Sequence, residues 1–237
     1  MKKKNKIKNA AKKLYNLFVL DRSGSMMGLR QSTIESVNGQ IESLRSDAKK
    51  NENVSILCSL LLFDSRGDDS FHFCYVNTPV GDVKNITEAD YLPNGGTPLR
   101  DAIGVGIQRL QRELGDSIGH DDVNILVTIF TDGAENSSTQ FSHDQISKMI
   151  KHLSSDKKWT FSFIGSGGIA EVQAYSTSLN ICASNTMAYD GTKAGYTRSV
   201  KKLQMARTSY VSNLAAGKDV SADFFAGGSE EESEKKV

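Results

Sequence analysis

Three short segments of the sequence place aspartate, serine or threonine beside glycine. DRSGSMMG (residues 21–28) directly follows the apolar run LYNLFVL (residues 14–20), and TDGAENSS (residues 131–138) follows the apolar run VNILVTIF (residues 123–130). The third segment, NGGTP (residues 94–98), opens a helical pattern. Glycine lets the backbone turn sharply and come close to a ligand, so each segment could present its side-chain oxygens to one.

The side chains in these segments are hard oxygen donors, with no histidine or cysteine beside them. Such donors suit magnesium, manganese or calcium, whereas zinc, copper and iron are poor candidates. Two carboxylates and three hydroxyls would leave a divalent ion electrophilic enough to accept one more anionic oxygen, whereas a calcium buffer surrounds its ion with more carboxylates. The candidate metal ligands are Asp21, Ser23, Ser25, Thr97 and Asp132.

Each segment also has a purely structural interpretation. The serines after Asp21 could cap a helix, GGTP is an ordinary helix start with proline at its first position, and TDG is an ordinary turn. For any one segment alone, the structural interpretation is favoured. The three together, in this order and at these strand ends, favour a binding site.

Several residues near these segments have alternative roles. Arg22 could steer an acidic partner, or its stem could lie over the edge of the sheet. Asp101, one helical turn after Thr97, could accept a hydrogen bond from behind a metal ligand or interact with the helix N-terminus. Residues 136–138 could contact a partner, although loop capping is favoured, and Asp64 is expected to be solvated on a hairpin turn.

Apolar runs alternate with helical patterns along the chain. Strands are expected at 14–20, 53–63, 71–77, 123–130, 159–165 and near 186–189, and helices at 29–50, from about 98, at 143–155, at 169–180 and at about 191–210. This order predicts an α/β fold with a doubly wound, mostly parallel central sheet, one antiparallel edge strand, and helices on both faces. Ligands of such sheets bind beyond the carboxyl ends of the strands, where the candidate segments lie.

The folded part is expected to be one domain spanning residues 14–205. A basic flexible arm, residues 1–13, carries seven lysines and no acid, and a partly ordered C-terminal extension, residues 206–237, ends in an acidic tail. The arm could attract the phosphates of nucleic acid or a membrane surface, but a solubilising role is favoured because no aromatic residue is interleaved in it. Phe224 and Phe225 are expected to dock on the protein's own body.

Composition also bears on the compartment. The sequence shows no secretory signal and no apolar run approaching the roughly 18 residues that a membrane span needs. Cys58, Cys74 and Cys182 have no CxxC spacing and are interpreted as reduced thiols rather than disulfides or zinc ligands. These features predict a cytoplasmic protein that engages neither a membrane nor nucleic acid.

The segments DRSGSM, GGTPL and FTDGAEN resemble the three parts of the metal-ion-dependent adhesion site (MIDAS) of von Willebrand factor A (VWA) domains, in family order over about 190 residues. The resemblance implies a doubly wound α/β sandwich. It also implies one divalent cation, Mg²⁺ in first place and Mn²⁺ or Ca²⁺ as alternatives, whose open position is filled by a Glu or Asp of a partner protein. It assigns as ligands, some direct and some through water, Asp21, Ser23, Ser25, Thr97 and Asp132.

GGTPL and TDG.EN are closest to the cytoplasmic bacterial and phage members of that family, including those similar to tellurite-resistance-associated proteins. The predicted function is therefore a non-catalytic, metal-dependent protein-binding module. One alternative is a magnesium-dependent phosphohydrolase with Asp21 as nucleophile, which is disfavoured because Ser23 stands where such enzymes usually carry a second acid. Another is an accessory module of an ATPase or nucleic-acid complex, in which the partner hydrolyses nucleotide because this chain has no P-loop. The oligomeric state is not predicted.

Overall fold

The computed structural model describes residues 11–226. Within this range one six-stranded sheet has the order β3-β2-β1-β4-β5-β6, and neighbouring strands are parallel except for the antiparallel pair β2 and β3. The strands are β1 (Lys12–Asp21), β2 (Val54–Phe63), β3 (Phe71–Pro79), β4 (Val123–Thr131), β5 (Trp159–Ser166) and β6 (Thr186–Tyr189).

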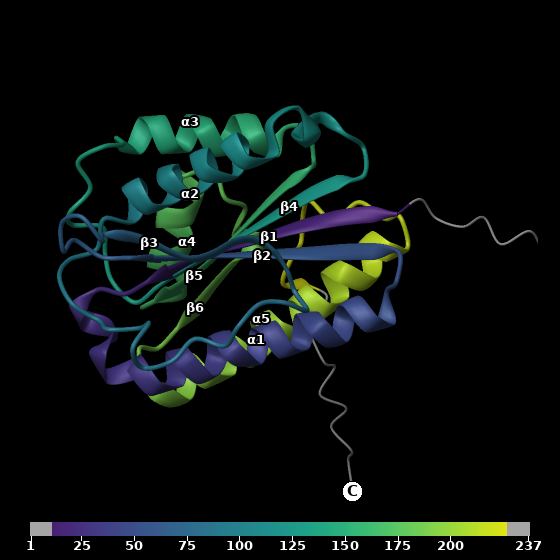
Figure 1. The fold of residues 1–237 in the computed structure, drawn as a ribbon. Coiled ribbons are helices and arrows are strands. Elements are labelled where there is room, and N and C mark those ends of the chain that lie inside the picture. The colour runs from purple at the N-terminus through teal and green to yellow at the C-terminus, as the bar shows by residue number, and fades with distance from the viewer. Residues whose placement is uncertain (1–10, 227–237) are drawn as a thin grey trace, which may run out of the picture.

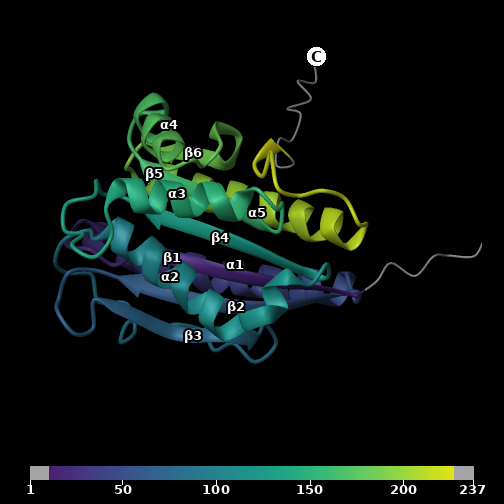
Figure 2. The same cartoon turned by 90° about the horizontal axis from the view of Figure 1, so that it is seen from above.

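Helices cover both faces of this sheet (Figures 1 and 2). One face carries α1 (Arg30–Lys50) and α5 (Lys193–Ala215), and the other carries α2 (Leu99–Leu114), α3 (His143–Ser154) and α4 (Ile169–Ser178). Every strand and helix expected from the sequence is present. The predicted α/β class, with a mostly parallel sheet and one antiparallel edge strand, is confirmed.

Strand β1 lies inside the sheet and is covered on both sides. Leu14, Phe18 and Leu20 pack into the core beneath α1 and α5, whereas Leu17 and Val19 pack into the core beneath α2 and α3. Successive side chains of a strand point to opposite faces, so burial on both faces removes the polar alternation seen in half-exposed strands. The same double coverage holds the carboxyl ends of the inner strands in place.

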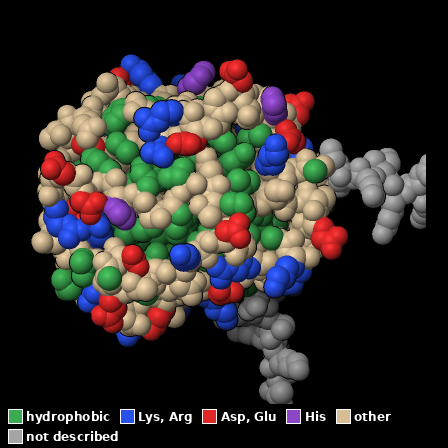
Figure 3. Space-filling view, in the orientation of Figure 1, with side chains coloured by type: hydrophobic (Ala, Val, Ile, Leu, Met, Phe, Trp, Pro, Cys, Tyr) green, Lys and Arg blue, Asp and Glu red, His purple; other side chains and the backbone are tan. Residues whose placement is uncertain are grey.

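Strand β3 forms the antiparallel edge of the sheet and is the least covered of the long strands. Its side chains are half-buried along almost its whole length. Figure 3 shows hydrophobic side chains gathered over the middle of this face, where β3 runs. The guanidinium of Arg109 lies over the Phe73 ring, 5.6 Å from its centroid, and so covers part of the strand.

The segment after α5 packs back onto the domain. Phe224 and Phe225 are buried, and the Phe224 ring lies 5.8 Å from that of Tyr210, so the expected docking of this phenylalanine pair on the protein's own body is confirmed. The domain boundary expected after residue 205 falls inside α5, because the buried face of that helix continues to its end. Residues 1–10 and 227–237, with most of the basic arm and the acidic tail, lie outside the described residues.

The structure shows the state of the cysteines and the character of the helices. All three cysteines are free thiols, as expected: Cys58 is buried, Cys74 is half-buried and Cys182 is exposed. Between residues 11 and 226, no helix is long and apolar enough to cross a membrane.

Candidate metal centre

Three loops that are far apart in the sequence meet at the carboxyl edge of the sheet, at the left of Figure 1. Strands β1 and β4 are parallel neighbours with Leu20 opposite Phe130, so the residues that follow them lie side by side. The loop before α2 joins them, because the Gly24 amide donates to the Gly95 carbonyl at 2.9 Å. The register of the sheet therefore brings the three candidate segments together.

Two glycines allow this close approach of the loops. Gly95 has a φ of +71°, and a Cβ at this position would lie 2.9 Å from Ser65 Oγ. A Cβ at Gly96 would overlap Ser137 Oγ. A larger residue at either position would push the loops apart, so the glycine pair before Thr97 is a packing requirement.

Asp21 is fully buried, and both of its carboxylate oxygens accept hydrogen bonds. Oδ1 accepts from the Ser23 amide at 2.7 Å, and Oδ2 accepts from the Thr131 hydroxyl at 2.5 Å. The Ser23 and Ser25 hydroxyl oxygens lie 3.0 Å apart, and Ser25 Oγ donates to Asp132 Oδ1 at 2.6 Å. Four of the five candidate ligands thus form one continuous hydrogen-bonded chain.

Thr97, the fifth candidate, faces the same space from the loop before α2. A Cβ placed on Gly133 would lie 3.1 Å from Thr97 Oγ1 and 3.6 Å from Ser25 Oγ. Asn136 holds the threonine, because its Oδ1 accepts from the Thr97 amide at 2.8 Å and its own amide donates to the Thr97 carbonyl at 3.2 Å. All five residues singled out in the sequence therefore lie in one place.

The two carboxylates of this cluster have no basic side chain beside them in the described part of the chain. Burial raises the pKa of Asp21 to about 6, against the hydrogen bonds from Thr131 and Ser23, and the nearby charge of Asp132 adds to the rise. Burial likewise raises the pKa of Asp132. Among residues 11–226, neither aspartate has a Lys, Arg or His within ion-pair distance. A bound cation would supply the missing positive charge.

The donor set fits a hard divalent cation. Within the described part of the chain, no group of three or more His, Cys, Asp or Glu side chains is arranged to hold a metal. The candidate site offers two carboxylates and three hydroxyls instead. Oxygen donors of this kind match Mg²⁺, Mn²⁺ or Ca²⁺ better than metals that prefer nitrogen or sulfur.

Thr131 contacts the candidate site and was not expected from the sequence to do so. Its hydroxyl donates to Asp21 Oδ2 and also accepts from the Gly133 amide at 3.1 Å, so it connects a candidate ligand to the loop after β4. It is almost completely buried at the last position of β4. Its place directly before Asp132 at a strand end was the available signal.

Arg22 and Asp64 form a buried ion pair, which contradicts the partner-steering alternative for Arg22 and the solvated position expected for Asp64. Arg22 is 3% exposed and its Nε donates to Asp64 Oδ2 at 2.7 Å, while Asp64 is 0% exposed and also binds Arg66 at 2.8 Å. Arg22 is therefore turned away from any partner, and Asp64 is not solvated. The reason is strand register: Asp21 pairs with Phe63 in neighbouring parallel strands, so the residues that follow them meet.

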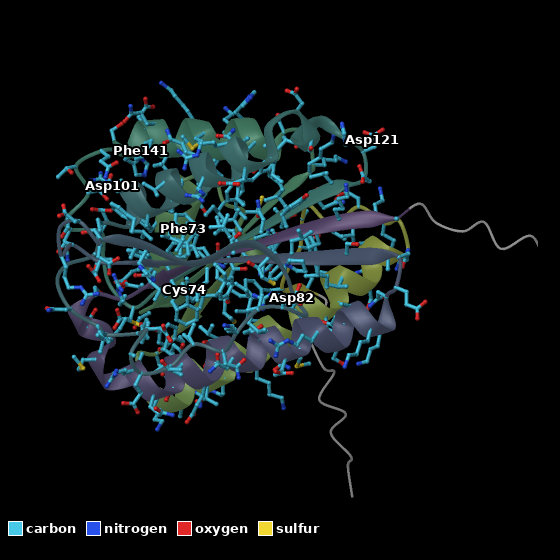
Figure 4. The ribbon with its side chains drawn as sticks, in the orientation of Figure 1. Phe73, Cys74, Asp82, Asp101, Asp121 and Phe141 are labelled. Atoms are coloured by element: carbon cyan, nitrogen blue, oxygen red, sulfur yellow. The ribbon has the colours of Figure 1, made fainter. Side chains whose placement is uncertain are left out.

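Asp101 ties the loop after β4 to the start of α2. Its carboxylate accepts from the amides of Thr139 at 2.7 Å, Gln140 at 3.0 Å and Phe141 at 2.8 Å. Figure 4 labels Asp101 and Phe141 close together at this edge of the molecule. Ser138 Oγ in turn accepts from the Asp101 amide at 3.1 Å, so the loop-capping role favoured for residues 136–138 is confirmed for Ser138.

Solved structures of other proteins share this architecture. The pilus adhesin SpaC from Lactobacillus rhamnosus GG, in an open conformation, matches with a TM-score of 0.58 and 14% identity over 87% of this chain and 30% of the adhesin chain. Proximal thread matrix protein 1 from the mussel byssus, with a zinc-occupied MIDAS motif, has a TM-score of 0.52 and 12% identity, covering 84% of this chain and 46% of its own. A von Willebrand factor type A protein from Catenulispora acidiphila has a TM-score of 0.50 and 13% identity, with 82% and 42% covered.

Sequence comparison adds no closer relative. No protein-family model matches the chain, and no curated protein sequence matches it. The chain spans less than half the length of the three structures above. Identities this low establish the fold alone, and on that ground the protein has the fold of a von Willebrand factor A domain.

Proposed function

We propose that this protein is a non-catalytic, metal-dependent protein-binding module. A divalent cation, Mg²⁺ in first place and Mn²⁺ or Ca²⁺ as alternatives, would be held by Asp21, Ser23, Ser25, Thr97 and Asp132. The open coordination position of this cation would accept a Glu or Asp side chain of the partner. The observation that carries the proposal is a pair of carboxylates, Asp21 buried and Asp132 half-buried, that have no basic partner within residues 11–226 and are linked through serine hydroxyls at the carboxyl edge of the sheet.

The residues around the ligands support binding by holding them in place in advance. Thr131 orients Asp21, Asn136 holds the loop that carries Thr97, and Asp101 holds the loop after Asp132. Side chains that are already ordered lose little conformational entropy when a ligand arrives. The ordered loops therefore support cation binding by lowering its entropic cost.

The surface around the site supports a protein partner. Among the described residues, the exposed large hydrophobic side chains are Met27 (58% exposed), Leu92 (47%) and Ile169 (51%). Met27 follows β1, Leu92 precedes the loop of Thr97, and Ile169 follows β5. All three therefore lie at the carboxyl edge of the sheet. Apolar side chains around a polar centre are a common feature of protein interfaces.

Two further assignments are part of the proposal. The segments GGTPL and FTDGAEN support a place in the cytoplasmic bacterial and phage branch of the VWA family. The three free thiols support a reducing compartment.

The sequence around Asp21 favours a binding module over a phosphohydrolase. Magnesium-dependent phosphohydrolases that use a strand-end aspartate as nucleophile usually carry a second acid two residues later, and that position is Ser23 in this chain.

Calorimetric titration of the chelator-treated protein with Mg²⁺, Mn²⁺, Ca²⁺ and Zn²⁺ tests the proposal. We expect one saturable site that is lost in Asp132→Asn. The matched control is Asp144→Asn, an exposed residue on α3 whose carboxylate pairs only with Lys148, and it should bind metal like the wild type. Absence of saturable binding of all four metals to the wild-type protein would refute the proposed function.

A further inference from the structure

A hollow of about 290 Å³ opens directly beside the candidate metal site. It lies between the loop after β4, the end of β5 and the first turns of α4. Phe163, Val172 and the Tyr175 ring give it apolar walls, and Glu171 and Ser166 add polar groups. Its size is sufficient for one long side chain of a bound protein.

The hollow and the candidate metal site share a wall. Thr131 and Gly133, the residues on either side of Asp132, both line the hollow. The Cβ position of Gly133 also lies within 4 Å of the hydroxyl oxygens of Thr97 and Ser25. A peptide that places a carboxylate at the cation therefore has a neighbouring side chain within reach of this hollow.

The lining of the hollow is negatively charged. It contains two glutamates and no Lys, Arg or His. Glu135 is already satisfied, because its oxygens accept from the amides of Ser137, Ser138 and Arg100 and the Arg100 guanidinium pairs with it at 3.6 Å, so the uncompensated charge of the lining is that of Glu171. Glu171 has no hydrogen bond or ion pair within residues 11–226, and it is the sole charged residue of α4. One unpaired carboxylate therefore stands beside three apolar walls.

We propose that the hollow takes a Lys or Arg side chain of the same partner that offers its carboxylate to the cation. The aliphatic stem packs against Phe163, Val172 and the Tyr175 ring, and the cationic head pairs with Glu171. Long basic side chains combine an apolar stem with a charged tip in this way, and an aromatic wall favours a cation. Glu171 is exposed, so its carboxylate is accessible to a cationic head, which a purely apolar guest does not offer.

This inference rests on the proposed function, and one experiment separates the two. A phage-displayed library of random nonapeptides is selected on the wild-type protein in Mg²⁺ and, separately, in chelator. We expect metal-dependent selection of peptides that carry an acidic residue and, a few positions away, Lys or Arg. The same selection on Glu171→Gln should retain the acidic residue and lose the basic one, whereas Glu52→Gln, an exposed glutamate elsewhere, should retain both.

A double-mutant cycle on one selected peptide gives the magnitude. Replacing its basic residue by an uncharged analogue, citrulline for Arg or norleucine for Lys, should weaken binding to the wild type about tenfold and leave binding to Glu171→Gln unchanged. Metal-dependent acidic peptides without basic enrichment, or with apolar enrichment, overturn this inference and leave the proposed function standing. If no peptide is selected in a metal-dependent way, both fail together.

Discussion

Replacing Thr131 by valine tests whether its hydrogen bond to Asp21 contributes to metal affinity, because Thr131 is not itself a candidate metal ligand. Valine has the shape of threonine without its hydroxyl, and residue 131 is buried at the end of β4, so the packing should survive. The change removes the donor to Asp21 Oδ2 at 2.5 Å and the acceptor for the Gly133 amide at 3.1 Å. Asp21 is completely buried, so water cannot replace the lost donor.

The expected magnitude follows from these contacts. A hydrogen bond to a buried charged group contributes about 1.5–3 kcal/mol. Groups that orient metal ligands typically contribute about 10- to 100-fold to metal affinity, which corresponds to about 1.4–2.8 kcal/mol. We therefore expect Thr131→Val to weaken Mg²⁺ or Mn²⁺ binding by about 10- to 100-fold, with the site still present.

Calorimetric titration with Mn²⁺ measures this effect, and thermal melts in chelator show whether the variant is folded. The matched control is Thr128→Val on the same strand, where the lost hydroxyl contacts Ser162 Oγ at 3.2 Å and no candidate ligand. Unchanged metal affinity in a folded Thr131→Val protein, or an equal loss in Thr128→Val, would show that the hydroxyl of residue 131 does not support the site.

Three further predictions concern proton competition and stability. The pKa of Asp21 in the metal-free protein is about 6, so protons should compete with the metal below that pH and lower the apparent metal affinity by up to about tenfold per pH unit. Metal titrations at pH 5 and pH 7 check this. Asp64→Ala leaves Arg22 and Arg66 without their buried partner and should lower the unfolding free energy by about 3–5 kcal/mol. Urea denaturation measures this loss, and a loss below about 1 kcal/mol would contradict the buried pairing. Phe224→Ala should cost about 3 kcal/mol in the same assay, and a variant as stable as the wild type would show that the segment after α5 does not dock.

The order of elements and the candidate ligands were predictable because they depend on short-range patterns. The runs at 14–20 and 123–130 are mostly apolar and lack polar alternation, which is typical of inner strands, and their lengths set where the loops begin. Asp21 and Asp132 stand at or directly after those ends, and parallel neighbours place their carboxyl ends at one edge. Fold class and the meeting of the loops follow from these facts.

The positions of neighbouring charges could not be predicted in the same way. Arg22 and Asp64 lie 42 residues apart, and each could have faced solvent as far as the sequence alone shows. Their pairing depends on the register between β1 and β2, which the packing of both strands against the helices sets. The same holds for Asp101, whose partners lie in a loop 38 to 40 residues away.

Strand length, helical periodicity and turn chemistry are local properties, so they could be predicted from the residues alone, and they specify an α/β chain with oxygen-bearing loops at strand ends. The groups that complete the site depend on how distant segments pack together. The tertiary structure joined the Thr131 hydroxyl to Asp21, buried Arg22 against Asp64, and opened a negatively charged hollow beside Gly133. Each of these depends on distances between segments far apart in the chain, and those distances exist only once the strands have paired and the helices have packed on them.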